Sequence, residues 1–234
     1  MDKLAVITGG SKGIGKALAE TFAAQGFHLA LCARNEADLK GLADTLSKEF
    51  GVKVFTRSVD VSSKESCQQF CAWVLDLGIS VEVLVNNAGV FLPGGILSEE
   101  EGAFEKMLHT NLCSAYYITR GLVPSMVTRK SGYVFNICSI ASFMAYANGG
   151  SYAITKHGML GMTKVLREET KTSGVRVSAV MPGAVLTDSW AGVDLPESRF
   201  IKPEDIASAI WSAYQLSPSA VVEQIIIRPQ LGDI

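Results

Sequence analysis

The sequence predicts an α/β fold in which about seven parallel strands form one sheet with helices on both faces. Short apolar runs alternate along the chain with longer stretches whose apolar residues recur every three or four positions. This alternation is typical of strands that are joined by crossover helices. With 234 residues, the chain has the length of one large domain, so we expect a single domain over residues 1–234.

The apolar runs, bounded by glycine and other turn residues, predict strands at 3–8, 28–33, 52–59, 81–85, 132–138, 175–180 and 221–228. Amphipathic spacing and capping residues predict helices after the turn at residue 13, over 35–50, from 62 or 63 to about 77, from about 99 to 111, over about 112–128, over 149–172 and from 202. Residues 188–201 are predicted to be irregular.

The composition of the chain argues against nucleic acid and membranes as partners. Hydrophobic residues make up 48% of the chain, charged residues 19%, and the net charge is −2. A nucleic-acid-binding surface is therefore not expected. No apolar run approaches the roughly 18 residues of a membrane span, and the N-terminus leads directly into a strand without a signal peptide. We expect a cytoplasmic protein with no membrane partner.

The cysteines and histidines do not form a metal-binding pattern. The five cysteines are an odd number scattered over predicted strands and helices, so disulfides are not expected. Cys67 and Cys71 lie one helical turn apart, but no second pair accompanies them. His28, His109 and His157 match no ligand spacing. We therefore predict buried thiols, no metal and no site role for the histidines.

A glycine-rich turn follows the first predicted strand. The sequence TGGSKGIG at residues 8–15 does not have the spacing of the G-x-G-x-x-G dinucleotide motif. Its glycines still allow the backbone to approach a pyrophosphate, and the helix that follows offers free N–H groups at its positive end. Alone, the motif is also compatible with an ordinary turn between strand and helix.

Tyr152 and Lys156 are four residues apart in a predicted helix. Residues at this spacing lie on one face, so an ammonium group would stand beside a phenol. A free tyrosine has a pKa of about 10, and a cation within about 4–6 Å favours the phenolate. We therefore expect Lys156 to lower the pKa of Tyr152 and make it a usable acid or base. By itself, the pair is also compatible with a lysine stem that covers an aromatic ring.

Further motifs occur at fixed places: NNAG at 86–89, Asn111, Ser139, and PGAVLT at 182–187. In this order, together with the glycine turn and Tyr152-x-x-x-Lys156, they resemble the short-chain dehydrogenase/reductase family. The resemblance extends over essentially the whole chain and implies a Rossmann-type fold.

The resemblance implies a catalytic set of Asn111, Ser139, Tyr152 and Lys156. Tyr152 follows Ser139 by 13 residues, as in the family. Ser139 would bind the substrate carbonyl, and Asn111 would bend its helix and order a water that links the lysine to solvent. Ser142 is the competing serine and a candidate substrate neighbour.

The same resemblance implies NADP(H) as cofactor. An acidic residue that would bind a ribose 2′-hydroxyl is expected at Ala33, but Arg34 follows instead and Lys12 adds a cation in the glycine turn. Surface charges without a role are the alternative. The cofactor contacts implied by the family motifs are Gly9, Ser11, Lys12, Gly13, Ile14, Gly15, Arg34, Asp60, Val61, Asn87, Ala88, Gly89, Tyr152, Lys156, Pro182, Gly183 and Thr187.

These features predict an NADPH-dependent carbonyl reductase, and three segments suggest a substrate. Residues 182–190, PEDIA at 203–207 and the stretch 221–234 are similar to bacterial sepiapterin reductase-like members of the family. Trp190, in a substrate lid at about 188–201, would stack on a pterin. Ser139 and Tyr152 would contact the substrate carbonyl, and Asp233 would bind the aminopyrimidine edge of the pterin. An ordinary hydrophobic lid residue is an equal interpretation of Trp190.

Two other functions stay open. A reductase of 3-oxoacyl thioesters or of general ketones would carry the same motifs, and an NADP-binding sensor or scaffold would need no turnover. The family resemblance also implies a homodimer or homotetramer.

Overall fold

The computed structural model describes residues 2–190 and 192–234. It shows one sheet whose strand order is β3-β2-β1-β4-β5-β6-β7, with every neighbouring pair parallel. The strands are β1 Lys3–Thr8, β2 His28–Ala33, β3 Val54–Ser58, β4 Ser80–Asn86, β5 Gly132–Ile137, β6 Val175–Pro182 and β7 Gln224–Ile227. The α-helices are α1 Gly13–Ala24, α2 Glu36–Phe50, α3 Lys64–Asp76, α4 Ala103–Met107, α5 Ser114–Arg129, α6 Gly150–Thr170 and α7 Pro203–Tyr214.

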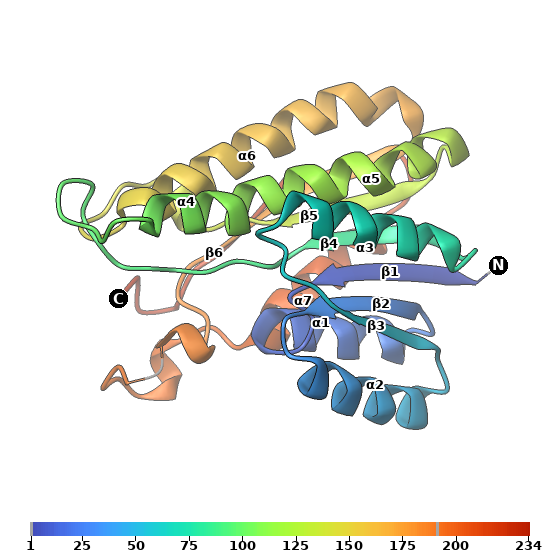
Figure 1. Cartoon of the computed structure of the whole chain (residues 1–234), viewed down its shortest axis with the longest axis horizontal. Coiled ribbons are helices and arrows are strands. Elements are labelled where there is room, and N and C mark those ends of the chain that lie inside the picture. Colours follow the sequence, from blue (N-terminus) through green and yellow to red (C-terminus); the bar gives the residue numbers. More distant parts are fainter. Residues whose placement is uncertain (1, 191) are drawn as a thin grey trace.

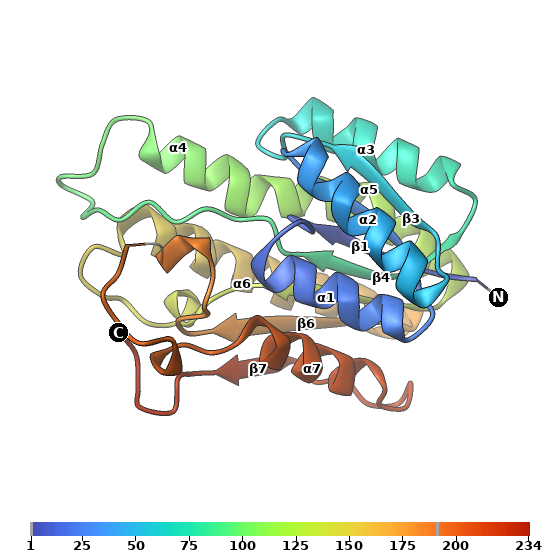
Figure 2. The same cartoon turned by 90° about the horizontal axis from the view of Figure 1, so that it is seen from below.

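Helices cover both faces of the sheet. Figure 1 shows α3, α4, α5 and α6 on one face and α1, α2 and α7 on the other, and the view from below in Figure 2 shows the second layer in front. The chain builds the sheet outward from β1 to β3, then returns to place β4 on the other side of β1. The loops that leave β1 and β4 therefore diverge, which is where ligands bind in sheets of this kind.

The layers form two main apolar cores. One core joins the sheet to α1, α2 and α7 around Phe22, Leu18 and Phe135, all fully buried. The other joins the sheet to α3 and α5 around Phe70 and Leu84. Because the central strands are covered on both faces, they read in the sequence as continuous apolar runs instead of alternating ones.

Caps fix several helix starts as the sequence predicts. The Asn35 side chain accepts hydrogen bonds from the backbone N–H groups of Ala37 and Asp38 at the start of α2. Of the two serines considered for α3, Ser63 is the cap, because its hydroxyl accepts the N–H of Ser66. Pro203 stands at the first position of α7.

The helix predicted from about residue 99 differs from the structure. It begins at Ala103, because Gly102 has a φ of +82° that a helix does not accommodate. At Asn111 the chain does not stop and restart but passes through a π-helix, Leu108–Cys113, into α5. Strands β3 and β7 are shorter at both ends than predicted, since they are limited to Val54–Ser58 and Gln224–Ile227.

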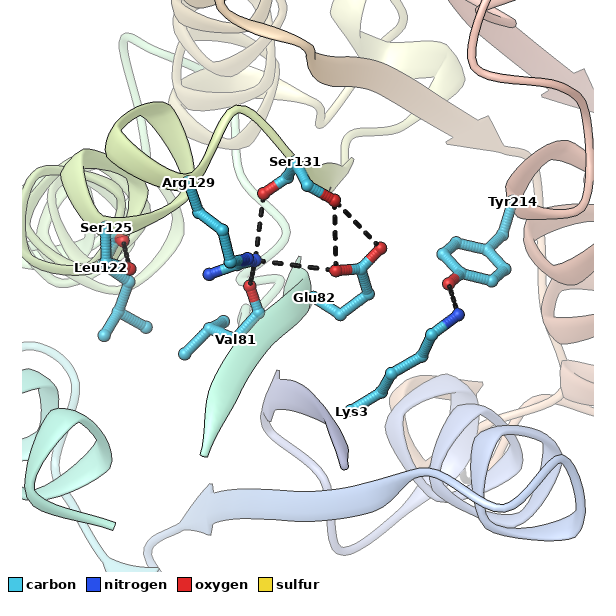
Figure 3. A network of polar contacts seen from close by, with 8 residues as sticks. All are labelled: Lys3, Val81, Glu82, Leu122, Ser125, Arg129, Ser131 and Tyr214. Carbon is cyan, nitrogen blue, oxygen red and sulfur yellow. Dashed lines mark hydrogen bonds and ion pairs between the residues drawn. The ribbon is translucent and has the colours of Figure 1, made fainter. Parts of the chain in front are cut away.

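A polar network closes the amino-end edge of the sheet, opposite the strand ends that face the ligand side (Figure 3). Arg129 at the end of α5 donates to the carbonyl oxygens of Val81, at 2.6 Å, and Ser131, at 2.9 Å, and lies 3.5 Å from Glu82. Nearby, Lys3 donates to the Tyr214 hydroxyl. These contacts anchor α5 and α7 at the edge where no predicted site residue lies.

The described part of the chain, residues 2–190 and 192–234, contains no helix whose length and apolarity would let it cross a membrane. In the same residues, no group of three or more histidine, cysteine and acidic side chains is arranged to hold a metal. All five cysteines are free thiols. Burial raises the pKa of the Cys67 thiol to about 11 and that of the Cys71 thiol to about 12, as expected for apolar packing.

Candidate active site

A cleft of about 1490 Å³ opens at the carboxyl ends of the strands. Its walls come from the loops after β1 to β6 and from residues 233 and 234. Figure 1 shows that the segment between β4 and α4, the segment between β6 and α7 and the last residues lie at this same end of the sheet. The predicted site residues line the cleft, with the exception of Gly15, Asn111 and Ser142.

The glycine turn needs glycine at three positions where the backbone is left-handed or closely packed. Gly9 and Gly13 have φ values of +63° and +49°, and a Cβ on Gly15 would lie 2.1 Å from the Gly9 carbonyl oxygen. A Cβ on Gly13 would lie 2.9 Å from the methyl group of Thr187 across the cleft. The first turn of α1 has no side-chain cap, so its N–H groups remain available on the cleft side.

The NNAG segment is fastened to the glycine turn. Asn87 Nδ2 donates to the carbonyl oxygens of Thr8, at 2.8 Å, and Gly9, at 3.1 Å. In return, the Thr8 hydroxyl accepts the backbone N–H groups of Asn87 and Ala88. These hydrogen bonds hold the ends of β1 and β4 at a fixed separation. The NNAG segment therefore has a structural role that an ordinary loop would not have.

Two cationic side chains, one after β1 and one after β2, face the cleft, and one of them has acidic neighbours. Arg34 and Lys12 both line the cleft. Lys12 Nζ lies 3.5 Å from Asp38 and 3.6 Å from Asp188, which belongs to the 188–201 segment. Asp60 lies at the same end, where hydrogen bonds from the side chain and backbone of Ser62 hold its pKa below the usual range.

Tyr152 and Lys156 project from the first two turns of α6, and Ser139 follows the end of β5. Lys156 is buried, and its Nζ donates to the carbonyl oxygen of Ile137 at 2.8 Å. Its Nζ lies 5.6 Å from the centre of the Tyr152 ring. The Phe91 ring contacts the other side of Tyr152 edge-on, with 5.0 Å between ring centres.

The expectation that Lys156 lowers the pKa of Tyr152 is wrong for this structure. Burial raises the pKa of Tyr152, and the hydrogen bond with Ser139 opposes that rise only in part. Burial also lowers the pKa of Lys156 to about 8. The ammonium group donates its hydrogen bond to the Ile137 carbonyl oxygen and lies beside the Tyr152 ring. The loss of hydration therefore outweighs the attraction between the two side chains.

Ser142 does not line the cleft, so its prediction as a substrate neighbour is wrong. Its side chain is buried, and its hydroxyl accepts the backbone N–H of Ser139 at 3.2 Å. The Ser139 hydroxyl in turn accepts the N–H of Ala141 at 3.1 Å. The two serines form a capping box around a short 3₁₀ turn, Ile140–Ser142, and Ser142 thereby fixes the backbone of the serine that faces the cleft.

The Asn111 side chain is fully buried and joins three elements. Its Oδ1 accepts the N–H of Val90 at 2.7 Å, and its Nδ2 donates to the Val90 carbonyl oxygen at 2.9 Å and to the Thr155 hydroxyl at 3.2 Å. Thr155 donates to the carbonyl oxygen of Tyr152 at 2.8 Å. Asn111 therefore ties the segment after β4 to α6, and both N–H groups of its amide are already used.

Several cleft residues were missed by the sequence analysis. Phe91, Tyr146 and His109 line the cleft, although His109 was assigned no role. Tyr146 stands six residues before Tyr152 and Phe91 two residues after Gly89, so proximity to the motifs was the available signal. His109 offered none, because the π-helix that aims it at the cleft is not apparent from apolar periodicity.

The two residues considered for substrate contact also line the cleft. Trp190 packs edge-on against Phe200, with 5.4 Å between ring centres. Asp233 is paired with Arg228, whose guanidinium donates to both of its carboxylate oxygens. The segment that carries Trp190 is pinned at its far end, where Ile201 exchanges backbone hydrogen bonds with Ala184 and Leu186.

Comparison with known proteins places the chain in a family. The sequence model of short chain dehydrogenases matches residues 3–197. A sepiapterin reductase from Chlorobaculum tepidum is 33% identical over 242 residues, covering 100% of this chain and 99% of the relative. The chain therefore belongs to the short chain dehydrogenase family, as the order of its motifs indicated, and it is an oxidoreductase.

Solved structures agree with this assignment. An alcohol dehydrogenase from the archaeon Thermococcus sibiricus, complexed with 5-hydroxy-NADP, superposes with a TM-score of 0.91 at 32% identity and covers 98% of this chain and 97% of its own. L-sorbose reductase from Gluconobacter frateurii, complexed with NADPH and L-sorbose, has a TM-score of 0.88 at 29% identity, with coverages of 97% and 95%.

The buried Lys156 gives the protein a pH-dependent stability. The unfolded chain keeps the lysine protonated up to its ordinary pKa of 10.5, whereas the folded chain releases the proton at about 8. Between these values the unfolded state binds more protons, so the free energy of unfolding rises with pH by up to about 3 kcal/mol. The free energy of unfolding would be measured by urea denaturation at pH 7 and at pH 10 for the unsubstituted protein and for Lys156→Met. From pH 7 to pH 10, we expect it to rise in the unsubstituted protein relative to the variant. Lys164→Met, on the exposed side of α6, is the matched control; a Lys156→Met difference that does not change with pH would contradict the assignment.

Proposed function

We propose that this protein is an NADPH-dependent carbonyl reductase whose catalytic residues are Ser139, Tyr152 and Lys156, with Asn111 in support. The observation that carries the proposal is one continuous cleft that runs from the glycine turn to Tyr152. A dinucleotide laid across the glycine turn would have its reactive end beside Ser139 and Tyr152. The family membership and the NADP-type cofactors in the two solved structures support the same conclusion.

The residues of the cleft fit NADP(H). The backbone of the glycine turn at Gly9 and Gly13, which carries no side chain, and the uncapped start of α1 suit a pyrophosphate. Arg34 and Lys12 suit a 2′-phosphate, since no carboxylate stands at Ala33. The other proposed contacts are Ser11, Ile14, Asp60, Val61, Asn87, Ala88, Gly89, Tyr152, Lys156, Pro182, Gly183 and Thr187.

NADPH, when bound, supplies the hydride that reduces the carbonyl carbon. The hydroxyl of Ser139 is proposed to donate a hydrogen bond to the carbonyl oxygen as negative charge develops there. Tyr152 is proposed to deliver the proton to this oxygen. Because burial raises its pKa, the phenol is protonated at neutral pH, so the proton to be delivered is present. Lys156 remains largely protonated at pH 7 and is proposed to hold ribose hydroxyls.

Replacing Tyr152 with phenylalanine tests the proton donor. We expect the turnover number to fall by roughly 10²–10⁴-fold, the usual contribution of a positioned acid, while NADPH affinity measured by fluorescence titration stays within a few-fold. Tyr146→Phe is the matched control, because it removes a phenol from the same cleft. Unchanged turnover in Tyr152→Phe would exclude the mechanism.

For the substrate, we propose a carbonyl on the side chain of a pteridine. The 33% identical sepiapterin reductase supports it, and so do Trp190 and Asp233, which line the cleft beside the proposed catalytic residues. Trp190 offers an aromatic face, and Arg228 orients the Asp233 carboxylate while leaving it able to accept further hydrogen bonds. The segment 188–201 is proposed to act as the substrate lid.

A 3-oxoacyl thioester or a general ketone is the alternative substrate. An acyl carrier protein is acidic and would favour a basic entrance, but Glu105, Asp188 and Asp233 stand in the cleft wall near Lys106 and Lys12. A general ketone reductase is favoured by the alcohol dehydrogenase and sugar reductase likenesses. A sensor without turnover is disfavoured by the complete set of Ser139, Tyr152 and Lys156.

A parallel assay distinguishes these substrates. NADPH oxidation by the purified protein would be followed with sepiapterin, an acetoacetyl thioester and a simple ketone, with NADH as the control cofactor. We expect the highest kcat/KM with sepiapterin and NADPH, and a loss of about tenfold in Trp190→Ala, the scale of one aromatic contact. Turnover of the thioester or ketone alone would reject the pteridine proposal, and equal rates with NADH would reject the role of Arg34.

We also propose a cytoplasmic homodimer or homotetramer. Free thiols agree with a reducing compartment. The outer sides of α5 and α6 expose Tyr116, Ile154 and Val165, each more than two-fifths accessible, which suits association of subunits through these helices. Light scattering is expected to give the mass of two or four chains, and a monomer at micromolar concentration would refute the proposal.

A further inference from the structure

Glu99 reaches from the segment between β4 and α4 to the start of α6, the helix that carries Tyr152. Ser151, the second residue of α6, donates its hydroxyl to Oε1 of Glu99 and its backbone N–H to Oε2, the latter at 3.5 Å. The residue in the N-cap position of α6 is Gly149, which has no side chain to cap the helix. The carboxylate of Glu99 therefore does for α6 what Asn35 does for α2, but from a distant part of the chain.

The contact is enclosed by glycines that leave no space between the two segments. The N–H of Gly94 donates to the Asn148 carbonyl oxygen at 3.0 Å. A Cβ on Gly150 would lie 2.4 Å from the Gly94 carbonyl oxygen and 3.2 Å from Oε2 of Glu99. A Cβ on Gly94 would lie 2.6 Å from the Cβ of Glu99. Residues 90–99, here called the strap, thus lie directly on the first turn of α6.

The strap also touches the reacting side chain. Phe91, at its beginning, packs edge-on against Tyr152, and Val90 before it is held by Asn111. The strap is consequently fixed at one end beside the proposed cofactor cleft and at the other end by Glu99 on α6. Loss of the Glu99 contact would release this end of the strap from Ser151, the residue that precedes Tyr152.

Glu99 also brings a carboxylate to the amino end of α6. Tyr152 is the third residue of α6, within the first turn, where the positive end of the helix favours a phenolate. A carboxylate at that end opposes this effect. The other polar groups that face Tyr152 are Lys156 from α6, Cys138 and Ser139 from the end of β5, and Tyr146 from the loop before α6.

We propose that Glu99 is a positioning residue, which caps α6 through Ser151 and so fixes Tyr152 against Phe91 and the cleft. This rests on the proposed function of Tyr152 as proton donor. The proposal includes the charge as well, because a carboxylate at the positive end of a helix disfavours a phenolate in its first turn. No motif of the sequence marks this residue, which is the first of three consecutive glutamates.

Two substitutions separate the hydrogen bonds from the charge. Glu99→Gln keeps an oxygen that can accept from Ser151 but removes the charge, whereas Glu99→Ala removes both. Glu100→Gln is the matched control, since it removes the same charge from the neighbouring, exposed residue. Circular dichroism would confirm that each variant is folded. If Glu99→Ala does not fold, Glu99→Gln still tests the effect of the charge.

The first readout needs no substrate. The ionisation of Tyr152 would be followed by ultraviolet difference titration against the Tyr152→Phe variant. We expect Glu99→Gln to lower the midpoint by about 0.2–0.7 pH unit, the scale of a single charge at a helix end, and Glu100→Gln to leave it unchanged. If Glu99→Gln and Glu99→Ala both leave the midpoint unchanged, the effect of the charge is excluded.

The second readout is catalytic. We expect Glu99→Ala to lower kcat about tenfold with little change in the KM for NADPH, and Glu99→Gln to retain most of kcat near neutral pH. A Glu99→Ala variant that is less stable but has an unchanged kcat and pH profile would reduce Glu99 to a structural cap and overturn the proposal. Absence of turnover in the unsubstituted protein would instead reject the proposed function, while the titration still decides on Glu99.

Discussion

The hydrogen bond from Lys156 Nζ to the Ile137 carbonyl oxygen joins α6 to the end of β5, and the arrangement of the cleft depends on this junction. Ser139 lies two residues beyond Ile137, and Tyr152 lies one helical turn before Lys156. One contact therefore places the serine, the phenol and the ammonium group in a common wall. Around it, Asn111 with Thr155 and Glu99 with Ser151 tie the same helix to the segment after β4. The site is held by polar contacts between elements that the parallel sheet brings to one edge.

Burial governs the chemistry of this wall more than the spacing of Tyr152 and Lys156 does. Removal from water raises the pKa of the phenol and lowers that of the ammonium group, so both shifts favour the uncharged form. A protonated phenol is the form that a reductase requires, whereas oxidation of an alcohol would need the phenolate. The raised pKa of Tyr152 thus agrees with its proposed role as proton donor, and the cationic side chains of Arg34 and Lys12 in the cleft agree with the proposed NADPH preference.

The sequence predicted the sheet, the cap at Asn35, a cap at Ser62 or Ser63, and the cleft-lining residues that belong to the motifs, because these depend on local patterns and on motifs at fixed positions. It failed where a property arises only in three dimensions. The π-helix around Asn111 accompanies a side chain that bonds to Val90, 21 residues away, and neither is visible in apolar periodicity. The Ser142 hydroxyl accepts the backbone N–H of Ser139. The pKa of Tyr152 depends mainly on burial, which the spacing of Tyr152 and Lys156 in the sequence does not show.

The central claim is that this cleft moves a hydride from NADPH directly to a carbonyl carbon while Tyr152 supplies the proton. The most direct measurement is to run the reduction with NADPH that carries deuterium at the transferable position of the nicotinamide, and to locate the label in the product alcohol by mass spectrometry and NMR. The account predicts one deuterium on the carbinol carbon and a hydroxyl proton derived from solvent. A product without deuterium at that carbon would contradict direct transfer in this site.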